Sequence, residues 1–198
     1  YEQGTNRSLT VEFMTINKDE FHFVQERIQR VFPEVHFHVR SVETQTPGLE
    51  VRRIRLYGEV LRPFVEKYDL LRGPKEDVTI SPGLRLAGRE VQAAYLRALF
   101  QADGTVRLRS RRSRTSDVVL TTVSPQLARD VQALLLNLGI YARVQRGTET
   151  RSNRRVPYFV SVGYADARNR FRELIGFVSE EKRSKLDRAC STDYPGKR

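Results

Sequence analysis

The pattern of hydrophobic and polar residues predicts that the chain twice runs from a strand into a helix. Residues 11–17 and 118–124 are rich in apolar and β-branched side chains over the length of a single strand. Each leads into a segment, 20–32 and 125–138, in which apolar residues recur at the three- and four-residue spacing of one helical face. The same order of elements therefore occurs in both halves of the chain.

The residues that flank these segments support the two helices. Asn17 and Ser124 stand where a side chain can accept a hydrogen bond from an unsatisfied N–H of the first turn. Pro125 occupies the first helical position, where its missing N–H removes no hydrogen bond, and Gly139 follows the second helix. We therefore predict helices that begin directly after Asn17 and Ser124.

An internal repeat extends this similarity beyond the first two elements. Thr15 and Thr122 correspond at a separation of 107 positions, and Phe64 and Phe171 correspond at the same separation. After each predicted helix come a strand, a basic loop, a second strand that ends in glycine, and a final helix. The second strands are 53–58 and 158–163, and the final helices are expected at 60–71 and 166–178.

This repeat predicts an α/β fold of the α+β type, made of two pseudo-symmetric αββαββα repeats with antiparallel sheets. The expected domains are residues 1–86 and residues 87–198. The helix that would open the first repeat is missing from residues 1–86, because the position 107 residues before Asp103 falls upstream of Tyr1.

Residues 96–104 end a helical segment with an acid and a glycine. Ala98 and Ala102 form a ridge of small residues, which would let a second helix approach closely. The carboxylate of Asp103 would face the negative end of the helix dipole, which is unfavourable unless a cation lies beside it. Two such helix ends side by side would bind a divalent cation. An Asp103-Gly104 turn without further function is the alternative.

The charge of the chain indicates a polyanionic partner. It has 35 Lys and Arg against 24 Asp and Glu, a net charge of +11. Many arginines alternate along predicted strands, which makes one face of a sheet basic, and the planar guanidinium pairs with phosphate and with the edge of guanine. A solvated face that keeps edge strands from aggregating is the alternative. The candidate DNA-binding residues are Arg52, Arg53, Arg55, Arg107, Arg109, Arg111, Arg112, Arg114, Arg143, Arg146, Arg154 and Arg155.

The composition also excludes several classes of protein. Hydrophobic residues make up 39% of the chain, enough for a core, but no apolar run approaches the roughly 20 residues that span a bilayer. No signal peptide is visible at the start, and the single cysteine, Cys190, excludes an internal disulfide. The histidines are not spaced as zinc ligands. We expect an intracellular, cytoplasmic protein without a membrane partner.

The motif and the repeat together resemble a known family. Residues 96–104 are similar to a signature motif in which Arg97 and Gln101 replace the usual small and acidic residues, while Asp103 and Gly104 are kept. On these residues the chain resembles the LAGLIDADG homing endonucleases, and more narrowly the endonuclease domain of an intein, with two repeats in one polypeptide. The resemblance covers almost the whole chain and also includes residues 121–124, 138–140, 175–177, Lys182 and Leu186.

The resemblance implies a monomer with an internal pseudo-twofold axis whose two saddle-shaped sheets lie in the major groove of double-stranded DNA. The terminal aspartates of the two motif helices would hold Mg²⁺ or Mn²⁺, and hydrolysis of one phosphodiester on each strand would leave short 3′ overhangs. Asp103 would be one metal ligand, with the Gly104 carbonyl as a second candidate from the same helix end. The other aspartate would belong to a motif upstream of Tyr1.

The resemblance also implies a basic residue beside each metal. In the second half this is Lys182, with Lys185 as a nearby substitute. In the first half Val78 occupies the position of the family's lysine, and Lys75 would compensate only if the loop differs. Surface lysines that favour a helix end are the alternative for Lys75 and Lys182. An enzyme that nicks DNA or is inactive is therefore an open possibility.

Two functions from different classes follow from this reading. The first is a site-specific, metal-dependent DNA endonuclease associated with an intein. The second is a nucleic-acid-binding module on the same fold that has lost cleavage, as in a degenerate intein domain or a maturase. The segment lacks the terminal nucleophile and the His-Asn pair of splicing chemistry, so it resembles an insertion between splicing blocks of a host protein. An unrelated basic α/β domain is a third reading.

Overall fold

The chain divides into two compact units, Tyr1–Leu71 and Arg72–Arg198, each with its own hydrophobic core. The computed structural model describes residues 2–3, 8–43, 50–68, 70, 74–108, 115–148 and 155–191. The division between the units falls before residues 74–86, whereas the sequence predicted it after residue 86. The physical reason is that Ile80 and Leu84 are buried in the core of the second unit.

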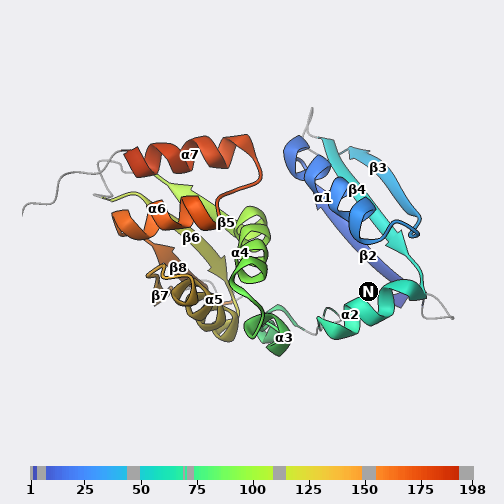
Figure 1. Cartoon of the computed structure of the whole chain (residues 1–198), viewed down its shortest axis with the longest axis horizontal. Coiled ribbons are helices and arrows are strands. Elements are labelled where there is room, and N and C mark those ends of the chain that lie inside the picture. The colour runs from blue at the N-terminus through green and yellow to red at the C-terminus, as the bar shows by residue number, and fades with distance from the viewer. Residues whose placement is uncertain are drawn as a thin grey trace, which may run out of the picture. The chain divides into compact units, whose positions relative to one another are not determined.

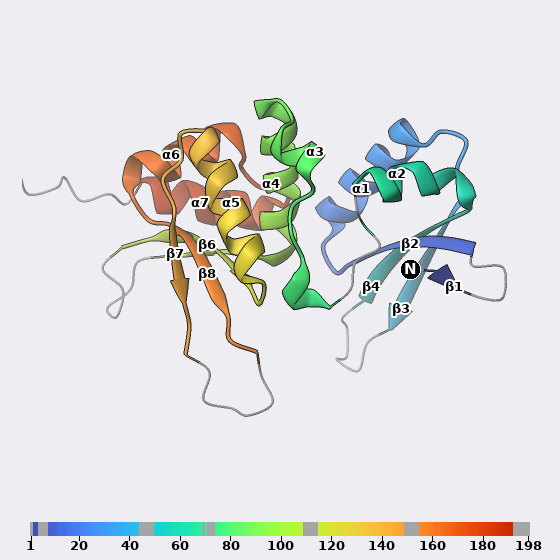
Figure 2. The same ribbon diagram turned by 90° about the horizontal axis from the view of Figure 1, so that it is seen from below.

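The first unit is a four-stranded antiparallel sheet with helices on one side of it (Figures 1 and 2). The strand order is β1-β2-β4-β3, and α1 connects β2 to β3. The elements are β1 (Glu2–Gln3), β2 (Ser8–Thr15), α1 (Lys18–Val31), β3 (Phe37–Glu43), β4 (Glu50–Tyr57), the 3₁₀ turn η1 (Glu59–Leu61) and α2 (Arg62–Lys67).

The second unit has a sheet of the same design, with strand order β5-β6-β8-β7 and α5 between β6 and β7. Its helices also lie on one side of the sheet (Figure 2). The elements are η2 (Lys75–Asp77), α3 (Pro82–Arg85), α4 (Arg89–Asp103), β5 (Gly104–Arg107), β6 (Asp117–Thr122), α5 (Pro125–Asn137), β7 (Arg143–Arg146), β8 (Tyr158–Val162), α6 (Ala165–Leu174) and α7 (Glu180–Ser191).

The predicted fold class is therefore confirmed, with helices packed on two antiparallel sheets of equivalent strand order. None of the helices within the described residues combines the length and hydrophobicity needed to cross a bilayer.

The predicted starts of α1 and α5 are also confirmed, and the two starts share one hydrogen-bond pattern. The side chains of Asn17 and Ser124 accept the N–H of the residue three positions on, at 3.1 and 3.0 Å. The hydroxyl oxygens of Thr15 and Thr122 accept the N–H groups of these cap residues, at 3.0 and 3.1 Å. The turn from strand to helix is thus stabilised in each unit by two side-chain acceptors at equivalent positions.

The final helices of the two halves are shorter than the sequence predicted. In the second unit α6 ends at Leu174 because Gly176 adopts a left-handed conformation, with φ of 61°, and its N–H donates to the Phe171 carbonyl at 2.8 Å. Positive φ is accessible to glycine at little cost, so the chain leaves the helix at this point. The predicted helix at 166–178 therefore becomes α6 and a loop that leads to α7.

Asp130 anchors the segment before α4 to the second unit. Its buried carboxylate accepts the backbone N–H of Ile80 and the side-chain N–H of Gln126, both at 2.9 Å, and it pairs with Arg85 at 3.4 Å. Nearby, the Ser124 hydroxyl donates to the Val78 carbonyl at 2.6 Å. These bonds explain why the segment packs with α5.

We predict that Asp130→Ala lowers the free energy of unfolding by about 1–3 kcal/mol, because the buried Ile80 N–H loses its acceptor. Urea denaturation measures the change. Asp187→Ala is the control. Asp187 is exposed and forms a long ion pair of 3.8 Å with the exposed Arg172, which contributes less than about 1 kcal/mol. Equal unfolding free energies for the two variants would contradict the anchoring role.

Candidate active site and nucleic-acid interface

Helix α4 passes directly into strand β5, with Asp103 as its last residue and Gly104 as the first of the strand. Gly104 has a φ of −92°, so it is not required for a left-handed turn. It is required by space, because a Cβ there would lie 2.5 Å from the Phe100 carbonyl oxygen and 2.9 Å from the Phe100 Cα. The motif glycine therefore allows the strand to leave the helix at close range.

The carboxylate of Asp103 lies on the exposed side of α4. Ala98 and Ala102 are exposed on the same helix, while Leu96 and Phe100 are buried in the core of the second unit. Within the described part of the chain, Asp103 forms no hydrogen bond or ion pair, and no group of three acidic, histidine or cysteine side chains could hold a metal ion. Asp103 fits a divalent cation as one ligand, which needs further ligands from elsewhere.

The ammonium group of Lys182 lies at the same helix end. Its Nζ donates to the carbonyl oxygens of Gln101 and Gly104, at 2.5 and 2.8 Å, and lies 3.5 Å from that of Phe100. The last carbonyls of a helix carry partial negative charge, so this cation stabilises them. The structure thus brings Lys182 next to the motif, as expected, but with a bonding pattern that caps the helix.

The same contact argues against the Gly104 carbonyl as a metal ligand. This oxygen accepts a hydrogen bond from the Lys182 ammonium at 2.8 Å. A divalent cation on the same oxygen would lie beside a positive charge, which is strongly unfavourable at such range. The Gly104 oxygen is therefore engaged by Lys182 in this structure, whereas the Asp103 carboxylate is exposed.

Two unusual residues of the motif hold α4 to the segment that follows α6. The Nε–H of Arg97 donates to the Ile175 carbonyl. The buried Gln101 side chain accepts the N–H groups of Val178 and Ser179, at 2.8 and 3.2 Å, and donates to the Ser179 hydroxyl at 3.0 Å. Both residues are therefore explained by contacts within the second unit.

The other lysines considered from the sequence occupy different surroundings. Lys185 donates to Glu181 at 2.6 Å, and this bond, with the charges of Lys185 and Lys182, holds the pKa of Glu181 below its usual value. Lys75 is exposed in η2, and no described contact joins it to the end of α4. Val78 packs against the core of the second unit.

In the first sheet, Arg53 and Arg55 lie on the face opposite the helices. Ile54 and Leu56 point into the core, so strand alternation turns Arg53 and Arg55 the other way. Arg52 shares the core side of the strand, where its guanidinium lies 5.7 Å from the centre of the Phe21 ring. Arg52 was expected with the others on one basic face, and alternation excludes it from that face.

A carboxylate on the neighbouring strand holds these arginines. Glu12 of β2 lies opposite Arg55 in the register, and its Oε2 accepts from the Arg55 Nε at 2.5 Å. Its Oε1 lies 3.6 Å from the Nε of Arg53. The sequence does not predict this pairing, because cross-strand partners depend on a register that one strand alone does not reveal.

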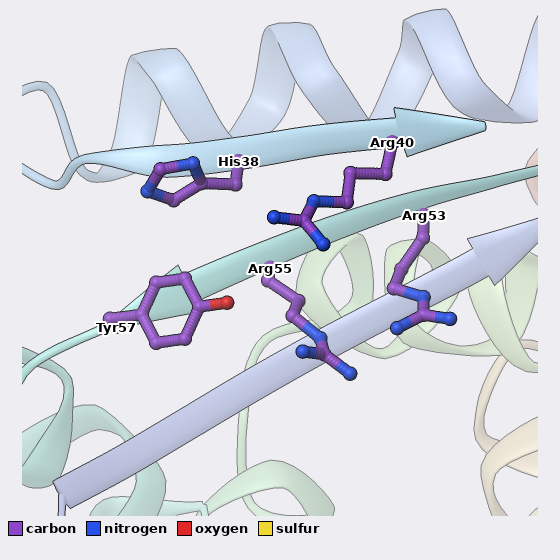
Figure 3. A pocket seen from close by; sticks show the side chains of 5 residues that line it. All are labelled: His38, Arg40, Arg53, Arg55 and Tyr57. Atoms are coloured by element: carbon purple, nitrogen blue, oxygen red, sulfur yellow. The ribbon is translucent and has the colours of Figure 1, made fainter. Parts of the chain in front are cut away.

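The same face is hollowed into a cavity of about 220 Å³. Figure 3 shows Arg53 and Arg55 reaching from β4 across β2, and Arg40 reaching from β3 over β4. His38 and Tyr57 line the remaining wall, with ring centres 5.6 Å apart in an edge-to-face arrangement. Three guanidinium groups around one concave surface make it attractive to an anion or to the acceptors of a base.

The second sheet repeats the pairing of an arginine with an acid. Arg107 of β5 lies opposite Asp117 of β6 and donates to it from two nitrogens, at 3.0 and 2.7 Å. Arg143 lies on this face. Arg146 lies opposite Tyr158 in the strand register and points to the other side of the sheet.

Arg155 forms an ion pair of 2.9 Å with Glu76. The predicted sites Arg109, Arg111, Arg112, Arg114 and Arg154 lie outside the described residues.

Comparison with family models supplies the deciding observation. Residues 90–176, which contain all of α4 except Arg89 and the strands β5 to β8, match the model of the LAGLIDADG-like domain. This part of the chain is therefore similar to a LAGLIDADG-like domain. The match ends before Lys182, so the helix end and the sheet belong to the matched region while the capping lysine does not.

Curated relatives of this chain are much longer proteins. It is 40% identical over 105 residues to replicative DNA helicase DnaB of Rhodothermus marinus, which covers 53% of the chain and 11% of that protein. It is 28% identical over 170 residues to the replication factor C small subunit of Methanocaldococcus jannaschii, covering 86% of the chain and 8% of that protein. It is 39% identical over 103 residues to a Thermococcus hydrothermalis DNA polymerase, covering 50% of the chain and 6% of that protein.

Solved structures show the same fold beyond the LAGLIDADG-like domain. I-DmoI in complex with DNA and Mn matches with a TM-score of 0.58 at 16% identity, over 89% of this chain and 86% of that one. The homing endonuclease I-WcaI bound to its DNA recognition sequence matches with a TM-score of 0.51 at 17% identity, over 94% and 79% of the two chains. The chain therefore has the fold of LAGLIDADG homing endonucleases.

We predict that Gly104→Ala lowers the free energy of unfolding by about 1–3 kcal/mol, because the added methyl group overlaps the end of α4. Thermal or urea unfolding measures the loss. Gly83→Ala is the matched control, since a Cβ at Gly83 meets nothing within 4 Å and the residue lies inside α3. A Gly104→Ala variant as stable as Gly83→Ala would refute the close-approach requirement.

Proposed function

We propose that the chain is the DNA-cleaving part of a site-specific, metal-dependent homing endonuclease that acts on double-stranded DNA. The observation that carries the proposal is the exposed carboxylate of Asp103 at the end of the motif helix of a LAGLIDADG-like domain. Arginine-bearing sheet faces in both units support a DNA partner. The net charge of +11 supports it further, because phosphate contacts dominate nucleic-acid affinity.

We further propose that the cation is Mg²⁺ or Mn²⁺. A divalent ion at such a site polarises a phosphodiester and activates water for its hydrolysis. Asp103 would supply one carboxylate ligand, and Lys182 would hold the helix end that carries it. Support comes from the fold, since I-DmoI has been solved with DNA and Mn.

The second acid of the site would come from a helix equivalent to α4 in the first unit. In the second sheet Gly104 lies opposite Leu120, which corresponds to Phe13 in the first repeat. In the first sheet Glu2 lies opposite Leu9, so an antiparallel partner for Phe13 would come four residues before Glu2. By this register, we propose that the first motif precedes Tyr1 in the natural protein.

An intein origin accounts for the diversity of the relatives. The chain matches short parts of a helicase, a replication factor and a DNA polymerase, between 6% and 11% of each. A segment shared by proteins of different function is typical of an insertion. We therefore propose that it lies within a splicing domain in an intracellular host protein.

A binding module without cleavage is the second candidate. It is favoured by Val78, an apolar residue that packs against the core at a position where the resemblance expects lysine. Both candidates require DNA binding, but only the endonuclease requires Asp103 to hold a metal.

We predict that Asp103→Asn in the full-length protein abolishes cleavage of DNA spanning the insertion site in the host gene, with binding retained. The amide keeps the shape of the side chain but loses the charge that binds the cation. Gel analysis of DNA incubated with Mg²⁺ measures cleavage, and titration in Ca²⁺ measures binding. Asp166→Asn, the same change at an exposed residue of α6, should leave both unchanged.

The outcomes separate the two candidates. If the Asp103→Asn variant still cleaves this DNA, the assigned site is refuted. Binding without cleavage by the natural protein would establish the second candidate.

A further inference from the structure

The open face of the first sheet combines arginines with one acid, Glu12. Glu12 lies on the face away from the core, its side chain only 16% exposed, with Arg55 bonded to one of its oxygens and Arg53 near the other. We propose that Glu12 is a positioning residue for DNA specificity, which aligns Arg53 and Arg55 to read two guanines two base pairs apart. This inference rests on the proposed function.

The geometry at Arg53 indicates that the face is arranged for a ligand. Its Nε is buried and has no hydrogen-bond partner among the described residues, although Glu12 lies 3.6 Å away. The gap of 3.6 Å is just longer than a hydrogen bond, so a small shift of the guanidinium on contact with a ligand would complete the bond to Glu12. The cavity bounded by Arg53 and Arg55 gives such a ligand access.

A carboxylate between two arginines favours base reading over general phosphate binding. An arginine without a partner is flexible and pairs with any phosphate, whereas a hydrogen bond from Arg55 to Glu12 fixes the direction of the guanidinium. The bond uses the Nε–H, one of five donors in the group. Guanine offers O6 and N7 to a guanidinium held in this way, and the negative charge of Glu12 repels nearby phosphates.

The spacing of the two arginines sets the spacing of the bases. Residues two apart on a strand are separated by about 7 Å on the same face. Successive base pairs rise by about 3.4 Å, so Arg53 and Arg55 match every second base pair when the strand follows the major groove. The expected signature is therefore two guanines separated by one unspecified base pair.

The second sheet supplies an independent example of the arrangement. Asp117 lies directly opposite Arg107, as Glu12 lies opposite Arg55, and it accepts two hydrogen bonds from that arginine. Both units therefore place an acid beside an arginine on the sheet face that does not pack against helices. A charge pair at a cross-strand position of each sheet indicates a shared role in orienting arginines.

The test is selection of bound duplexes from a random-sequence DNA library by the full-length protein in Ca²⁺, followed by sequencing. The natural protein should enrich two guanines two base pairs apart. Arg55→Lys and Arg53→Lys, which keep the charge but lose the fork, should each remove one of these guanines. Glu12→Gln should reduce the enrichment of both by about tenfold and should bind unselected DNA more tightly than the natural protein.

Glu50→Gln is the matched control. It removes the same charge from β4, but from a carboxylate 3.4 Å from Arg52 on the core side of the strand. It should leave the enrichment unchanged. Thermal unfolding of every variant shows whether it is folded, and the two lysine variants test the reading of guanine even where Glu12→Gln unfolds.

Each contrary result has a distinct meaning. A natural protein that fails to bind duplex DNA would refute the proposed function and this inference together. Binding without the guanine pair, or equal loss of enrichment in Glu12→Gln and Glu50→Gln, would overturn the inference and leave the proposed function intact.

Discussion

The contact between Lys182 and the end of α4 is the interaction on which the rest of the second unit depends. Helix α4 ends in a carboxylate at its negative pole, and it turns into β5 with no intervening loop. The ammonium of Lys182 offsets the negative carbonyls there, and Gln101 fixes the segment that leads to α7. Because β5 begins at this point, the stabilised helix end fixes where the first strand of the sheet starts.

A second constraint concerns the excess of positive charge on a small fold. Arginines side by side on a sheet repel one another, and the two sheets moderate this with Glu12 and Asp117 at cross-strand positions. The side chains of Glu12 and Asp117 are only 16% and 17% exposed, and their hydrogen bonds fix the direction of Arg55 and Arg107. The direction of these arginine side chains matters for recognition.

Local signals made much of the fold predictable, while contacts between distant segments were not. The starts of α1 and α5 could be predicted from Asn17 and Ser124, because capping depends on residues three positions apart. Gln101 looked like a departure from a motif, yet it bonds to Ser179, whose proximity only the folded chain reveals. Arg52 and Arg53 were both predicted on one basic strand face, although alternation within a single strand separates them. The helix predicted at 166–178 was too long because the chain leaves α6 before Gly176. The left-handed conformation of this residue could have been anticipated from its type.

The same local charges explain why a metal site at Asp103 would need a second acid. The ammonium of Lys182 compensates the helix carbonyls, and it also places a positive charge close to any cation bound at the helix end. One carboxylate then attracts a divalent ion against an opposing charge in its neighbourhood, and the net attraction is weak. A second carboxylate from another helix end would make the net electrostatic attraction strong enough for a divalent ion to bind. The proposed dependence on two motif helices thus follows from electrostatics at one of them.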